Sequence, residues 1–179
     1  LGVGGVTTIE VTQYRCKEPY SLKLTGQQGN VMKESMECAK TVAFNQLPAD
    51  AIAKYDKCPY GLHIHCPEAS VRKDGPSAGA AIVAAIYSYV SSKPIHPRFA
   101  ITGEIDLHGR IRAVGGLQAK LHGIHRAGVL TALVPKENEE DVEKLKLRDK
   151  LPIDLKFEIK FVETIDEVLS VMNLKILHS

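Results

Sequence analysis

The sequence predicts a single domain of the α+β class, with mixed sheets flanked by helices. The 179 residues include 44% hydrophobic and 25% charged residues, an ordinary globular composition in a chain long enough to bury a sizeable core. Segments with the alternation of strands and segments with helical periodicity follow one another in mixed order, without internal repeats. No long linker or low-complexity stretch divides them, so residues 1–179 are expected to form one compact domain.

The first elements are two strands and a long helix. Residues 7–14 and 21–25 are rich in β-branched and alternating residues, and the short turn at 17–19 predicts that they form a hairpin. Asn30 is placed to cap a helix over 31–47. The apolar stripe expected on this helix comprises Val31, Met32, Ser35, Cys38, Ala39 and Val42.

The rest of the chain alternates between strands and helices. The segment 47–61 shows no clear periodicity. The elements predicted after it are a strand at 62–66, a helix at about 77–91, strands at 99–105 and 111–115 around a turn at 106–109, a helix at 117–127, a strand at 131–135, a helix at 138–147, a strand at 156–162 and a helix at 164–172.

Charge and hydropathy exclude two classes of partner. The 23 basic residues exceed the 21 acidic ones by only two and are scattered, so we expect no nucleic-acid partner. The longest apolar stretch, 78–90, is too short to span a bilayer, so we expect no membrane. The four cysteines lack CxxC spacing, which favours a reducing, intracellular compartment. The start LGVGGVTT has no initiator Met or signal-peptide core and suggests a piece of a longer polypeptide.

Ser77, in the stretch KDGPSAG, is the first candidate for chemistry. Asp74 and Gly75 favour a turn, Pro76 lacks a backbone donor, and small residues follow the serine. We therefore expect Ser77 at the N-terminus of a buried helix. There, free N–H groups can stabilise an oxyanion beside a nucleophile, or the serine can be a plain helix cap. The local sequence leaves both interpretations open.

Lys120 is the candidate base that a serine nucleophile needs. Leu117, Leu121 and Ile124 define the buried stripe of the predicted helix 117–127, and Lys120 falls on the same stripe. Burial would lower its pKa toward the range of a general base near neutral pH. The alternative is a lysine that extends from the edge of the stripe to water.

Two further polar clusters are candidates. Thr102 and Glu104 form a polar row along the predicted strand 99–105, where a hydroxyl can orient an amine or simply occupy a β-favouring site. The run HIHC, His63 to Cys66, has alternation that suits zinc ligands, but we favour a buried strand with partnered histidines and a packed thiol.

The chain contains no GxxxxGK[ST] motif. The lysine of KDGPSAG precedes the glycines and cannot play the role of the phosphate-binding lysine. We therefore expect no cofactor, and no bound ATP, in this domain.

Taken together, these motifs resemble the proteolytic domain of Lon, the ATP-dependent serine protease family. The resemblance covers essentially the whole chain and is carried by LTGQQGNVMKES, HIHCPEASVRKDGPSAGAAI, FAITGEIDLHGRIRAVGGLQAKLHGIHRAG and VPKENEEDVEKL. It implies a serine endopeptidase in which Ser77 attacks the peptide carbonyl and Lys120 activates it. The supporting or gating positions implied by the resemblance are Thr102, which holds the lysine amine, Asp74 at the rim, and His63, His65 and Glu104 nearby.

The resemblance also implies partners outside this domain. It predicts unfolded polypeptide substrates, an upstream ATPase module that uses ATP and Mg, a hexameric ring, and a cytoplasmic or mitochondrial-matrix location. Asn30, residues 69–72 (ASVR) and Gln118 depart from the family pattern without removing the Ser-Lys pair. The alternatives are a catalytically silent peptide-binding or assembly module of the same fold, and a zinc hydrolase that uses HIHC.

Overall fold

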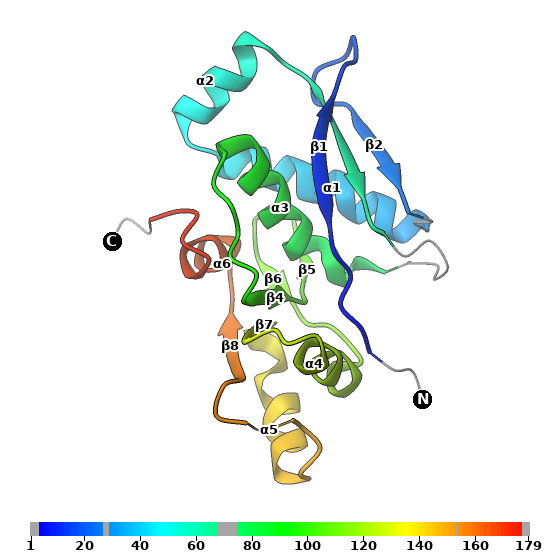
Figure 1. The fold of residues 1–179 in the computed structure, drawn as a ribbon, viewed down its shortest axis with the longest axis vertical. Coiled ribbons are helices and arrows are strands. Elements are labelled where there is room, and N and C mark those ends of the chain that lie inside the picture. Colours follow the sequence, from blue (N-terminus) through cyan, green and yellow to red (C-terminus); the bar gives the residue numbers. More distant parts are fainter. Residues whose placement is uncertain (1–3, 27–28, 68–74, 153, 177–179) are drawn as a thin grey trace.

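The computed structural model describes residues 4–26, 29–67, 75–152 and 154–176. In these ranges, helices and strands are interspersed in an α+β arrangement, which confirms the predicted class (Figure 1). One three-stranded sheet lies with α1–α3 in one half of the molecule, and a second lies with α4 and α5 in the other. Among the described helices, none has the length and apolar character needed to cross a membrane.

The first sheet has the order β1-β3-β2. Its strands are β1 (Glu10–Tyr14), β2 (Leu22–Thr25) and β3 (Gly61–His65). The predicted hairpin is wrong, because β1 pairs antiparallel with β3 and β2 pairs parallel with β3. Leu62 and Ile64 of β3 are fully buried, and a strand this apolar is best accommodated at the centre of the sheet, with paired strands on both sides.

Helix α1 (Asn30–Gln46) packs along α3 (Gly79–Ser91) beside this sheet. Two expectations about α1 are wrong. Gly29 is its N-cap residue and Asn30 is already its first residue, so the Asn30 side chain is not the cap. Val31 is 46% exposed, whereas Met36, outside the predicted stripe, is fully buried.

Helix α2 (Ala49–Lys57) occupies the segment that showed no clear periodicity. Its end signals were present in the sequence. Pro48 precedes it, Asp50 lies in its first turn, and Lys54 is in its last turn, as the helix dipole favours. Tyr55 anchors α2, because its ring is buried.

The second sheet consists of parallel strands in the order β4-β7-β8. Its strands are β4 (Phe99–Ile101), β7 (Thr131–Pro135) and β8 (Glu158–Val162). Strands β5 (Glu104–Ile105) and β6 (Ile111–Arg112) form a separate antiparallel pair. The prediction of one strand over 99–105 is therefore wrong, because the chain leaves the β4 pairing at Thr102 and Gly103.

The remaining helices are α4 (Leu117–Arg126), α5 (Glu139–Leu147) and α6 (Ile165–Val171), and 3-10 turns η1 (Pro76–Ala78) and η2 (Lys136–Asn138) precede α3 and α5. These helices match the predicted ones within a few residues. The turn at 106–109 is also confirmed, since Gly109 has φ 79° and donates its N–H to the Asp106 carbonyl at 3.0 Å.

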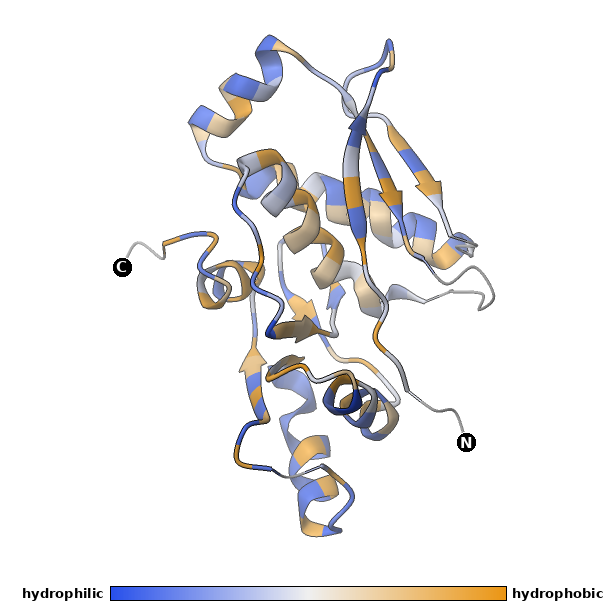
Figure 2. Ribbon diagram, in the orientation of Figure 1, coloured by the Kyte–Doolittle hydropathy of each residue, from blue (hydrophilic) through white to orange (hydrophobic). Residues whose placement is uncertain are grey.

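The buried apolar residues form two separate cores. The larger, here called the α3 core, joins α1, α2, α3, α6 and β3, and the hydropathy colouring of Figure 2 shows how apolar the α3 residues are. The smaller, the α4 core, comprises Leu117, Leu121, Ile124, Ala132, Val134, Val142 and Leu151. Strand β7 separates the two, because Leu133 belongs to the α3 core while its neighbours Ala132 and Val134 belong to the α4 core.

Candidate active site

Ser77 lies in the middle of η1, one turn before α3 begins at Gly79. The backbone of Gly103 fixes this turn from both sides. Its N–H donates to the Ser77 carbonyl at 2.8 Å, and its carbonyl accepts from the Ala80 N–H at 3.1 Å. The N-cap residue of α3 is Ala78, and no side-chain capping bond is formed there or at Gly75, the N-cap of η1. The geometry therefore argues against Ser77 as a plain helix cap.

Two glycines allow the backbone segments around Ser77 to pack this closely. A Cβ added at Gly103 would lie 2.7 Å from Cγ2 of Ile111, and one added at Gly79 would lie 2.8 Å from Cγ2 of Ile105. Real side chains do not tolerate such distances. The small residues after the serine are thus explained by the approach of the β5–β6 pair to the start of α3.

Lys120 extends from the first half of α4, and its side chain is half-buried. Leu117, Leu121 and Ile124 are buried, as the predicted stripe requires. Burial lowers the pKa of the Lys120 ammonium below its usual value, because desolvation disfavours the charged form. Lys120 therefore lies at the edge of the buried stripe, with part of its side chain exposed.

Ser77, Thr102 and Lys120 line a single pocket of about 580 Å³, here called the Ser77–Lys120 pocket. Most of its other lining residues are small or apolar, among them Met32, Ala81, Ala84, Ile95, Phe99 and Ile124. The serine precedes α3 and the lysine lies on α4, so the pocket is lined from both halves of the molecule.

Thr102 is buried at the point where β4 ends. Its N–H donates to the Leu133 carbonyl at 3.1 Å, which fixes its backbone to β7. Glu104, two residues later, is paired with Arg112 in the β5–β6 ladder and is not among the residues lining the pocket. The structure therefore brings together Thr102 with Ser77 and Lys120, and leaves Glu104 outside.

His63 and His65 do not line the Ser77–Lys120 pocket either. Both lie on one face of β3, where the Thr25 hydroxyl bonds Nε2 of His63 at 2.8 Å and Nδ1 of His65 at 2.7 Å. Cys66 is fully buried, beside Ile64 in the α3 core. Since alternate residues of a strand face opposite sides, the HIHC zinc set does not converge, and no metal-ligand group of three occurs within the described ranges.

Asp74 and the ASVR segment lie outside the described residues. The other two departures from the family pattern lie away from the pocket. Asn30 begins α1, and Gln118 lines a different cavity, on the far side of α4.

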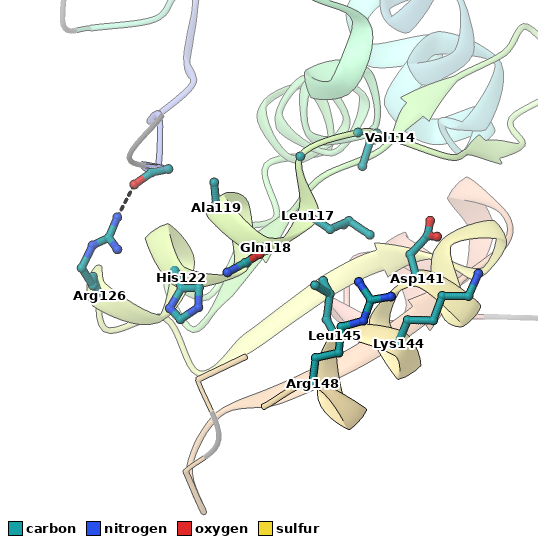
Figure 3. A pocket seen from close by; sticks show the side chains of 13 residues that line it. Val114, Leu117, Gln118, Ala119, His122, Arg126, Asp141, Lys144, Leu145 and Arg148 are labelled. Atoms are coloured by element: carbon teal, nitrogen blue, oxygen red, sulfur yellow. Dashed lines mark hydrogen bonds between the residues drawn. The ribbon is translucent and has the colours of Figure 1, made fainter. Parts of the chain in front are cut away.

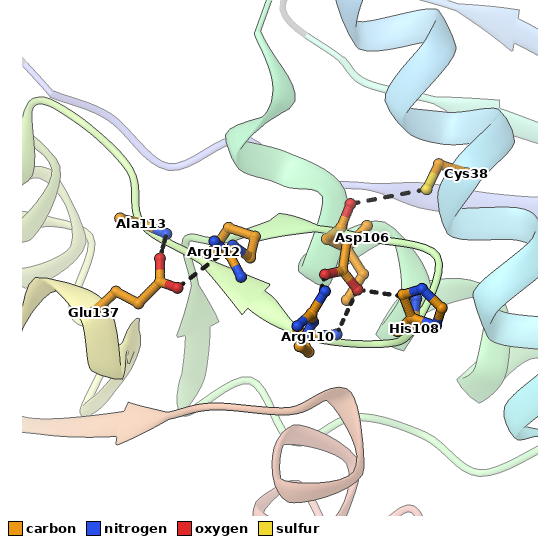
Figure 4. Close-up of polar contacts among 8 residues, drawn as sticks. Cys38, Asp106, His108, Arg110, Arg112, Ala113 and Glu137 are labelled. Atoms are coloured by element: carbon orange, nitrogen blue, oxygen red, sulfur yellow. Dashed lines mark hydrogen bonds and ion pairs between the residues drawn. The ribbon is translucent and has the colours of Figure 1, made fainter.

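Two residues that the sequence pattern did not indicate hold the loop before α4. The buried amide of Asn138 accepts from the Val114 N–H at 2.9 Å and donates to the Val114 carbonyl at 3.0 Å. Glu137 accepts from the Ala113 N–H at 2.8 Å and pairs with Arg112 at 3.4 Å (Figure 4). The run KEN offered a signal, since asparagine side chains often bond backbone groups.

Comparisons with known proteins identify the family. Residues 2–175 match the family model described as the Lon protease (S16) C-terminal proteolytic domain. The chain is 39% identical over 167 residues to Lon protease of Fervidobacterium nodosum, covering 93% of this chain and 20% of the relative. It is 42% identical over 181 residues to Lon protease of Clostridioides difficile, covering 97% and 21%.

A third relative, Lon protease of Buchnera aphidicola, is 43% identical over 144 residues, or 80% of this chain and 18% of the relative. The chain thus spans about a fifth of the length of these curated relatives. The family match covers nearly the whole chain, from strand β1 through helix α6. The chain belongs to the Lon protease (S16) C-terminal proteolytic domain family.

Proposed function

We propose that this domain hydrolyses peptide bonds with Ser77 as nucleophile and Lys120 as general base. One observation carries the proposal: the serine and a half-buried lysine, whose pKa burial lowers, line the same pocket. A neutral amine can take the hydroxyl proton that an ammonium cannot. Membership of a protease family agrees with this chemistry.

The reaction follows the acyl-enzyme route. Neutral Lys120 takes the proton as Ser77 Oγ bonds to the scissile carbonyl carbon, forming a tetrahedral oxyanion. Collapse of this intermediate breaks the C–N bond, and the Lys120 ammonium returns the proton to the leaving amine. Lys120 then deprotonates a water molecule that attacks the ester, and the released Ser77 oxygen recovers the proton from Lys120.

We assign the stabilisation of the oxyanion to backbone N–H groups of η1. The first N–H groups of a helical turn have no partner within the helix. The Ala80 N–H is already taken by the Gly103 carbonyl, which leaves those of Ser77 and Ala78 as candidates. The Thr102 hydroxyl, on the same pocket wall, is proposed to orient the Lys120 amine.

The family resemblance extends the proposal to a protein as long as its relatives, each called Lon protease. In that setting the domain would degrade unfolded polypeptides in a reducing intracellular compartment. A hexameric ring and a separate module using ATP and Mg would deliver the chains. The domain itself would need no cofactor.

The test is labelling by a serine-directed peptide boronate, together with peptide cleavage. The unaltered chain should bind the boronate and cleave, whereas Ser77→Ala and Lys120→Met should lose at least about 10³-fold in rate. Ser88→Ala, near the end of the helix that follows Ser77, and Lys144→Met, on the exposed face of α5, are matched controls. Cleavage that survives in Ser77→Ala would refute the nucleophile, and a folded chain without boronate binding or cleavage would favour the silent binding module.

A further inference from the structure

Residues 4–9, here called the strap, precede β1 and have no regular secondary structure. Five consecutive residues of the strap, Gly5 to Ile9, line the Ser77–Lys120 pocket. Val6 packs against the α4 core, and Ile9 packs against the α3 core. The strap therefore forms one wall of the pocket and bridges the two halves that supply the lysine and the serine.

The strap is held at its start by one face of α4. Arg126 Nη2 donates to the Gly4 carbonyl at 2.5 Å (Figure 3). A Cβ added at Gly123 would lie 2.5 Å from the Gly4 carbonyl carbon, and one added at Gly4 would overlap the Ala119 carbonyl. Residues 119, 123 and 126 are spaced i, i+4, i+7, so these contacts form a continuous stripe along the helix that also carries Lys120.

Gly123 is unfavourable for the helix itself. A glycine inside a helix costs about 1 kcal/mol relative to alanine. Its Cα has an ordinary helical environment, yet the space where a Cβ would stand is filled by the backbone of Gly4 and Gly5. The contact with the strap is the feature of the structure that requires glycine here.

We propose that Gly123 and Arg126 are positioning residues that hold the strap against α4, so that the strap forms the substrate-binding wall of the Ser77–Lys120 pocket. The inference rests on the proposed peptidase function. Neither side chain touches the reacting atoms. Their effect passes through the strap to the bound peptide, and therefore to KM more than to kcat.

The experiment compares Gly123→Ala, Arg126→Ala and Arg126→Lys in the same chain. The methyl group of Gly123→Ala displaces the strap, and the gain in helix propensity offsets part of the packing that the strap loses, so Tm should fall less than the clash alone would cause. We expect KM for a peptide to rise roughly tenfold in Gly123→Ala and Arg126→Ala, with kcat within about twofold. Arg126→Lys, which keeps a donor, should recover part of the loss. Gln118→Ala, exposed on the same helix, is the control.

Hydrogen exchange of amides 5–9 gives a readout independent of activity. It should become faster in Gly123→Ala and Arg126→Ala and stay unchanged in Gln118→Ala. Unchanged exchange in both variants, or a fall in kcat at constant KM, would overturn the inference. If the unaltered chain shows no Ser77-dependent cleavage, the proposed function fails, while the exchange result still decides whether these residues hold the strap.

Discussion

The two halves of the molecule hold their reactive side chains in different ways. Ser77 precedes Ala78 and Ala80, which pack in the α3 core, and two backbone hydrogen bonds to Gly103 fix its turn directly. Lys120 projects from a helix that rests on a small core and depends on the loop before it and on the strap. The comparison indicates that the lysine is the more easily displaced partner of the proposed pair.

Strand β7 is the physical link between these halves. Its side chains alternate between the cores, and the Leu133 carbonyl accepts from the Thr102 N–H beside the pocket. A change in the packing of either core therefore reaches the Ser77–Lys120 pocket through one short strand.

The largest predicted effect on stability comes from a cavity in the α4 core. Leu121 is fully buried on α4, and Leu121→Ala should lower the free energy of unfolding by about 2–5 kcal/mol. Because α4 has few other apolar contacts, peptide cleavage should disappear below the temperature of global unfolding. Urea denaturation and cleavage rates measure the two quantities.

Leu62→Ala makes the matched cavity in the α3 core, since Leu62 is also fully buried. It should cost a similar free energy while cleavage persists until the whole chain unfolds. Equal temperature dependence of cleavage in both variants would contradict the distinction between the cores.

The next effect concerns the loop that begins α4. Asn138→Ala leaves the N–H and carbonyl of Val114 without their partner, at a cost of about 1–3 kcal/mol. The first turn of α4, which carries Lys120, should then be held less firmly. We therefore expect kcat per folded molecule to fall, in addition to the loss of folded protein. Asn45→Ala, at an exposed position of α1, is the control for amide removal. A fall in stability with unchanged kcat would show that Asn138 only stabilises the fold.

Local pattern predicted much of the fold and of the candidate site. The stripe around Lys120 and the position of Ser77 near a helix start were accessible because they depend on residues within two turns of each other. Strand order was not, because the placement of β3 between β1 and β2 is decided by burial of residues about 40 to 50 positions away. The roles of Asn138 and the strap were missed for the same reason, since their partners lie 24 or more residues away.

Overpacking at Gly79 tests whether the β5–β6 pair holds Ser77 in position. The methyl group of Gly79→Ala would meet Cγ2 of Ile105 at 2.8 Å and Oγ of Ser35 at 3.1 Å, so overpacking should cost about 1–3 kcal/mol. Because η1 ends one residue earlier, boronate binding by Ser77 should weaken as well. Gly115→Ala, where an added Cβ meets nothing within 4 Å, should change neither. Native boronate affinity in Gly79→Ala would show that the β5–β6 pair does not position Ser77.

The smallest predicted effect is a stabilisation of the fold, on replacing Lys120. Burial lowers the pKa of Lys120 from 10.5, so between the folded and unfolded values the unfolded chain binds more protons and stability rises with pH. Below the folded pKa the buried charge opposes folding. Lys120→Met removes that charge and should raise Tm at pH 7, while cleavage is lost.

The increase in Tm caused by Lys120→Met should become smaller as the pH approaches 10.5, because the unaltered lysine then becomes neutral in the folded state. Thermal melts of both proteins from neutral to alkaline pH measure this difference, and Lys144→Met controls for the loss of an exposed lysine. Peptide cleavage by the unaltered chain should rise with pH over the range in which the folded Lys120 loses its proton. A Tm difference that stays constant with pH would mean that the small core does not hold Lys120 away from water, and the contrast between the two halves would then rest on the strap and Asn138 alone.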